Sequence, residues 1–228
     1  MREQLALDFR LPDTATFSSF YIADNKELFA SVQRAAQVPN TTLIYLWGAS
    51  GSGCSHLLQA ACHTASSSVY LPLKDCLNYG VDILVGLEQT HLVCFDNIEA
   101  VSGNMLWQQK IFHLFNALRE HGNNIIVASR MSATALELQL ADLKSRLAWG
   151  ASYQIQALTD SDKIAALQLR AQARGLQLDA RVGKYLLDRL PRDMSQLFAS
   201  LELLDKASLV EQRKLSIPFV KTILSGIL

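Results

Sequence analysis

The chain has 228 residues, of which 50% are hydrophobic and 18% charged, a composition that supports a substantial core and excludes wholesale disorder. This length suits one large domain, or a domain of about 150 residues with a smaller companion. Lys and Arg total 21, as do Asp and Glu. Proteins that bind duplex DNA usually carry a basic excess, so strong direct binding to DNA is not expected.

Segments of helix and strand character alternate along the first two thirds of the chain. Residues 1–14 form a tail that ends in a Pro-Asp turn signal. After it, we expect helices at 25–37, 56–65 and 106–119 and strands at 43–47, 69–73, 91–95, 124–128 and 153–155. Alternation of this kind predicts an α/β domain over residues 15–158, with a parallel sheet and right-handed crossovers.

A different pattern begins at Thr159. Thr159 and Asp162 form a T-x-x-D helix start that resembles a capping box, with Asp in place of the usual Glu or Gln. No convincing strand signal follows, and helices are expected at 161–174, 179–190, 193–207 and 217–228. We therefore expect a small helical second domain over residues 159–228.

The sequence carries no targeting or membrane signal. No apolar run approaches the roughly 20 residues that span a bilayer, and the N-terminus lacks the apolar stretch of a signal peptide. The four cysteines include no CxxC pair and no Cys/His cluster of the zinc type. We expect a cytoplasmic protein with reduced thiols and no membrane association.

A glycine-rich segment, GASGSGCS, follows the strand expected at 43–47. It matches the phosphate-binding pattern G-x-x-x-x-G-K-[ST], except that Cys54 replaces the lysine. Glycines let main-chain N–H groups turn towards phosphate oxygens, and the next helix directs its N-terminus at the same anion. A turn without a ligand is the alternative, but the strand before and the helix after favour phosphate binding. The residues expected to bind the nucleotide here are Gly48, Ser50, Gly51, Ser52, Gly53, Cys54, Ser55 and His56.

Two departures from the pattern argue against hydrolysis by the chain itself. Cys54 offers no charge to the β- and γ-phosphates, although main-chain groups can still bind a diphosphate. Asp96 ends the apolar run 91–95 and, with Ser55, forms the expected ligand pair for Mg²⁺, the alternative being an Asp that caps the next loop. The following residue, where a second acid would polarise the attacking water, is Asn97. Fast autonomous ATP hydrolysis is therefore not expected.

Several segments resemble the AAA+ core and helical lid of the DnaA family of bacterial replication initiators. The box SRLAWG at Ser145–Gly150 resembles the one before the last strand, residues 111–129 resemble the helix-and-sensor segment, and residues 16–32 resemble the opening segment beside the adenine pocket. No segment resembling the initiator's DNA-binding domain follows. The tail QLALDF at 4–9 resembles a sliding-clamp-binding peptide. Together with KLSIPFVKTIL at 214–224, these features are similar to the Hda family, the regulatory inactivators of DnaA.

This resemblance implies a negative regulator of replication initiation. Such a protein binds the DNA-loaded sliding clamp, the beta subunit of DNA polymerase III, docks on DnaA and promotes hydrolysis of DnaA's ATP. By position, the resemblance implies that Arg146 is an arginine finger acting in trans and that Arg192 touches the phosphates of the chain's own nucleotide, a structural nucleoside diphosphate such as ADP. It also implies a base-side pocket at Phe20, Tyr21 and Ile22, and clamp binding through Gln4, Leu5, Leu7 and Phe9.

Alternatives stay open at this point. A free-standing slow ATPase would rest on the glycine-rich loop and Asp96, with Cys54 and Asn97 against it. A DnaA-like adaptor that targets other factors to DNA is the other function, with the neutral charge against direct DNA contact. The tail can alternatively fold back on its own domain, and association with further copies of the chain is also open.

The sensor position, which the resemblance implies is acidic in many relatives, falls near Ser129-Arg130.

Overall fold

The computed structural model describes residues 15–225, so the expected clamp-binding residues Gln4, Leu5, Leu7 and Phe9 lie outside the described part of the chain. The chain divides into two compact units. The larger unit takes in residues 24–49 and 53–156, and the smaller one takes in residues 18–23, 50–52 and the segment from 157 onwards. Each unit is described by itself.

The larger unit is built on a five-stranded parallel sheet in the order β2-β3-β4-β1-β5. The strands are β1 (Leu43–Trp47), β2 (Ser68–Pro72), β3 (Leu92–Asp96), β4 (Asn124–Ser129) and β5 (Ala151–Gln154). The helices are α1 (Lys26–Gln37), α2 (Cys54–Thr64), α3 (Leu73–Cys76), α4 (Met105–Glu120) and α5 (Ala141–Trp149). Short 3₁₀ turns complete the unit at Phe17–Ser19, Val81–Leu84, Leu87–Gln89, Ile98–Val101 and Ala133–Ala135.

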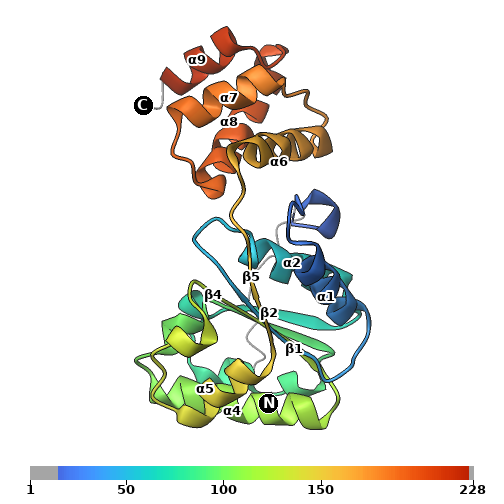
Figure 1. Ribbon diagram of the computed structural model, residues 1–228, viewed down its shortest axis with the longest axis vertical. Helices are drawn as coiled ribbons and strands as arrows, with labels where there is room; N and C mark the ends of the chain where they lie inside the picture. The colour runs from blue at the N-terminus through green and yellow to red at the C-terminus, as the bar shows by residue number, and fades with distance from the viewer. Residues whose placement is uncertain (1–14, 226–228) are drawn as a thin grey trace. The chain divides into compact units, whose positions relative to one another are not determined.

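Helices cover both faces of this sheet, with α1 and α2 on one face and α4 and α5 on the other (Figure 1). On the α4 and α5 face, Tyr45, Phe95 and Val127 pack against helix residues such as Ile111 and Leu147. β3 and β4 are buried along their whole length. Burial on both faces explains why these strands are near-continuous apolar runs in the sequence.

The predicted parallel α/β architecture is therefore confirmed, with shifts at element ends. Leu73, expected to close the second strand, instead begins α3. The reason is Pro72, which has no N–H to extend a ladder and stands at the end of an edge strand. The fifth strand begins at Ala151, two residues earlier than expected.

The smaller unit is helical and contains α6 (Asp160–Ala173), α7 (Ala180–Arg189), α8 (Met194–Glu211) and α9 (Ile217–Ser225). The expected capping box is present, because Thr159 accepts the N–H of Asp162 while the Asp162 side chain accepts the N–H of Thr159. Fully buried leucines hold the helices together, among them Leu167, Leu186 and Leu201. Across the described residues, no helix is long and apolar enough to cross a membrane.

Candidate nucleotide site and exposed arginine

The glycine-rich loop joins β1 to α2, as the sequence predicts. Gly51 and Gly53 have φ angles of 75° and 105°, in the left-handed region that glycine adopts without strain. The N–H of Gly48 donates to Ser129 O over 3.2 Å and fixes the start of the loop beside β4. α2 begins at Cys54, so the unpaired N–H groups of its first turn face the loop. The loop therefore offers main-chain donors to an anion, with a partly exposed thiol where a lysine is usual.

His56 differs from the other residues expected to bind the nucleotide. Its Nε2 lies 2.8 Å from Thr16 O, so the ring ties the first turn of α2 to the segment that precedes α1. Ser50, Ser52 and Ser55 keep side chains that are partly or largely exposed. His56 is thus placed to fix the helix that carries the loop.

Asp96, the last residue of β3, is only 3% exposed, and its carboxylate is already hydrogen-bonded. The Tyr70 hydroxyl donates to Oδ2 over 2.6 Å, and the N–H of Asn97 donates to Oδ1 over 2.9 Å. Burial, followed by the charge of Asp96, raises the pKa of Tyr70, while hydrogen bonds from Gln59 and Ser55 lower it. Tyr70 thus engages Asp96, one of the two residues expected to hold Mg²⁺. Sequence reasoning missed it, because nothing in the edge strand SVYLP marks the tyrosine.

These side chains do not fit an open magnesium site. Mg²⁺ requires near-ideal octahedral geometry, and a P-loop site supplies a serine hydroxyl and an unblocked acidic strand end. Here the acidic strand end is blocked, because the phenol of Tyr70 donates to the carboxylate of Asp96. Among the residues that the structure describes, no three His, Cys, Asp or Glu side chains form a metal-binding cluster.

Glu99, the other acid after β3, points towards the end of β4. The hydroxyl of Ser129 donates to its Oε2 over 2.9 Å, and Nε of Arg130 lies 3.9 Å from Oε1. Asn97 adopts a left-handed φ of 58° between the strand and the 3₁₀ turn that carries Glu99. The carboxylates nearest to Asn97 are therefore both engaged within the protein.

Arg146 is partly exposed and belongs to a cluster with the exposed side chains of Arg119 on α4 and Trp149 on α5. Trp149 is 68% exposed, and the guanidinium carbons of Arg119 and Arg146 lie 4.4 Å and 5.6 Å from the centre of its ring. Both distances are within the range of cation–π attraction. Within residues 15–225, neither arginine forms an ion pair with a carboxylate. Arg119 was not anticipated, because its position beside Trp149 depends on how α4 packs against α5.

The glycine-rich loop and the end of α5 lie at opposite ends of β1. Gly150 directly follows α5 and packs against Leu43, the first residue of β1, whereas the glycine-rich loop follows Trp47, the last. Four residue steps of about 3.3 Å separate these two positions, which is about 13 Å. Arg146 belongs to the last turn of α5, four residues before Gly150.

The residues expected at the base and the lid lie together in the smaller unit. Phe20 is buried, and the Tyr21 hydroxyl donates to Asp162 Oδ1 over 3.3 Å. Arg192 Nη1 donates to Asp160 Oδ2 over 2.9 Å, and the two side chains are 61% and 52% exposed. An ion pair this exposed contributes little stability.

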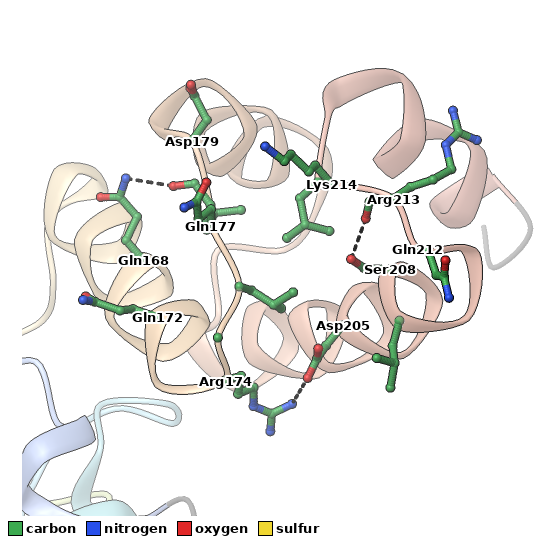
Figure 2. Close-up of a pocket in the computed structure, with 15 residues that line it drawn as sticks. Gln168, Gln172, Arg174, Gln177, Asp179, Asp205, Ser208, Gln212, Arg213 and Lys214 are labelled. Atoms are coloured by element: carbon green, nitrogen blue, oxygen red, sulfur yellow. Dashed lines mark hydrogen bonds and ion pairs between the residues drawn. The ribbon is translucent and has the colours of Figure 1, made fainter.

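The smaller unit also contains a hollow that sequence reasoning did not anticipate, with a volume of about 1140 Å³ (Figure 2). Its polar side chains largely bond to their neighbours: Gln168 donates to Leu178 O over 3.1 Å, and Arg174 lies 3.4 Å from Asp205. Ser208 donates to Arg213 O over 2.6 Å. None of the residues predicted to act in the site lines this hollow.

Two segments of the chain match models of known protein families. Residues 160–224 match the family model described as Hda, lid domain, and residues 82–154 match the one described as bacterial DnaA ATPase domain. Domain III of the Thermotoga maritima replication initiation protein DnaA is 18% identical, with a TM-score of 0.82 over 95% of this chain and 98% of that chain. AMPPCP-bound DnaA from Aquifex aeolicus is 24% identical, with a TM-score of 0.68 over 86% and 66% of the two chains. Similarity at these identities establishes the fold.

Proposed function

We propose that this chain is a negative regulator of DNA replication initiation. Its similarity to DnaA-like AAA+ proteins and its lid of the Hda type are the premise. In this proposal it holds a nucleoside diphosphate as a structural ligand, binds the sliding clamp through residues 4–9 and offers Arg146 to ATP bound by DnaA. Its activity is then the stimulation of another protein's ATPase.

The observation that carries the proposal is the position of Arg146. It lies in the last turn of α5, close in the chain to Gly150 and beside exposed Trp149, while the chain's own loop follows the last residue of β1. In this proposal, its guanidinium reaches a γ-phosphate that another molecule presents. Arginine fingers supplied in this way accelerate phosphoryl transfer by about 10³–10⁵-fold, because they stabilise charge in the transition state.

The residues at the carboxyl ends of the strands support a nucleotide that is bound there and not hydrolysed. Cys54 supplies no cation, Asn97 supplies no carboxylate, and Asp96 and Glu99 are both hydrogen-bonded within the protein. The main-chain donors of the loop and the helix N-terminus still suit a diphosphate. A bound diphosphate would be contacted by Arg192 once that side chain leaves Asp160. Two solved DnaA structures with this fold contain AMPPCP, which is consistent with nucleotide binding.

The test compares variants for ATP hydrolysis by DnaA in the presence of clamp loaded on DNA. Arg146→Ala is expected to abolish stimulation while it retains ADP and clamp binding. Arg189→Ala is the matched control, because Arg189 is also an exposed arginine that stacks on an aromatic ring, 5.7 Å from the centre of Tyr185. It should stimulate like the wild type.

A second variant separates the tail from the finger. Gln4→Ala combined with Leu5→Ala should lose clamp binding in a pull-down and, with it, stimulation, although Arg146 is intact. Full stimulation by Arg146→Ala would refute the assignment of the finger. Unchanged clamp binding by the tail variant would refute the assignment of the tail.

A further inference from the structure

Tyr70 lies under the first turns of α2. Ser68 and Tyr70 point to the same face of β2, and the Ser68 hydroxyl donates to Cys62 O over 2.8 Å, so this face is covered by α2. The Tyr70 ring reaches from β2 towards β3, where its hydroxyl meets Asp96. Ser55 and Gln59 lie four residues apart on one face of α2, the helix that covers this face of β2.

The directions of these hydrogen bonds follow from the groups involved. An ionised carboxylate only accepts, so the phenol proton must point to Asp96 Oδ2. Both carboxylate oxygens of Asp96 therefore accept a hydrogen bond, Oδ2 from the Tyr70 hydroxyl and Oδ1 from the N–H of Asn97.

These two hydrogen bonds engage the acidic strand end that would face a divalent cation. In P-loop proteins the serine hydroxyl and the acidic strand end face each other across Mg²⁺ and its bound water. Here a protonated phenol lies 2.6 Å from Asp96 Oδ2. A neutral donor compensates the buried carboxylate without adding the positive charge that would bridge two phosphates.

We infer that this chain binds its nucleoside diphosphate without a divalent cation, because the Tyr70 hydroxyl takes the position on Asp96 that water of a hydrated cation would take. The inference rests on the nucleotide binding proposed above and specifies its chemistry. Loop N–H groups and Arg192 are then the groups that carry the phosphate charge.

The experiment is a calorimetric titration of ADP into the full chain, with excess Mg²⁺ or with EDTA. For the wild type, ADP should bind no more tightly with excess Mg²⁺ than with EDTA, since the cation makes no contact with the protein and competes for the free diphosphate. Tyr70→Phe removes the phenol hydroxyl and frees Asp96, and ADP should then bind at least about fivefold more tightly with Mg²⁺ than with EDTA. Tyr185→Phe, a change at a lid tyrosine far along the chain, should behave like the wild type.

A second measurement uses Mn²⁺ and the wild type alone, so the inference can be judged even if Tyr70→Phe does not fold. Added protein should shift the electron paramagnetic resonance spectrum of Mn²⁺ with ADP towards that of free aqueous Mn²⁺, because the protein takes up ADP and leaves the cation in solution. A signal of protein-bound Mn²⁺, or ADP affinity that collapses in EDTA, would overturn the inference and leave the proposed function intact. Absence of ADP binding in both conditions would overturn the inference together with the nucleotide part of the proposed function.

Discussion

Replacing Asn124 with alanine is expected to lower the free energy of unfolding by about 4 kcal/mol, at about 1 kcal/mol for each of four hydrogen bonds. Asn124 is fully buried at the start of β4. Its Oδ1 accepts the N–H groups of Asn40 and Thr42, each over 2.9 Å. Its Nδ2 donates to Ala35 O over 2.8 Å and to Val38 O over 2.7 Å.

The reason for this dependence is in the sequence between α1 and β1. The carbonyl of Ala35 would normally accept the N–H four residues later, but that residue is Pro39, which has none. The amide of Asn124 supplies the missing donor. Without it, buried main-chain groups lose their partners, which costs more than the loss of an exposed bond.

Asn123→Ala provides the matched control, because the neighbouring side chain makes a single 2.8 Å bond to Glu88 O. Its expected loss is about 1 kcal/mol. The assay is urea unfolding followed by tryptophan fluorescence, since Trp47, Trp107 and Trp149 are the three tryptophans and all belong to the larger unit. A loss for Asn124→Ala no greater than that for Asn123→Ala would refute the reasoning.

Two further predictions concern the same unit. Burial raises the pKa of Tyr45 from 10.0 to about 12, so between these pH values the unfolded chain releases a proton that the folded chain keeps. The stability that protonated Tyr45 contributes is complete below pH 10 and is lost as the pH rises towards 12. Urea titrations should show this fall in the free energy of unfolding, and Tyr45→Phe should make the fall shallower. Gly150→Ala should destabilise the fold by about 1–3 kcal/mol, because the added Cβ would lie 2.8 Å from Leu43 O. Gly103→Ala, with nothing within 4 Å of the added Cβ, should change stability by less than about 0.5 kcal/mol in the same assay, and equal effects would contradict the packing argument.

The sequence predicts most of the sheet because its signals are local. The strands ending at Trp47 and Asp96 are apolar runs next to recognisable motifs, and the turn to the lid carries its own capping box at Thr159. Tyr70 was missed because its bond to Asp96 joins residues 26 positions apart, and no local pattern encodes such a pair.

The surroundings of Arg146 also could not be predicted from a local sequence pattern. The role of Arg146 came from resemblance, since a partly exposed arginine on a helix has no distinctive periodicity. Its neighbours became visible only with the packing of α4 on α5, which brings Arg119 and Arg146 to the ring of Trp149. In the sequence, Asn124 is an ordinary polar residue at the start of a strand, although its amide binds the end of α1 and so holds the connection between α1 and β1 in place.

Three features at the carboxyl ends of the strands act in the same direction: Cys54, Asn97 and the bond between Asp96 and Tyr70. A lysine at position 54 would restore a charge near the phosphates, but Asn97 would still lack a carboxylate and Asp96 would still be bonded to Tyr70. Each of these three features weakens hydrolysis by a different route, while none of them removes the main-chain donors that hold a diphosphate. The end of α5 is separated from the glycine-rich loop by the length of β1, so loss of chemistry at the loop leaves Arg146 and Trp149 unaffected. A nucleotide that is held and not hydrolysed is therefore compatible with a catalytic arginine on the same chain.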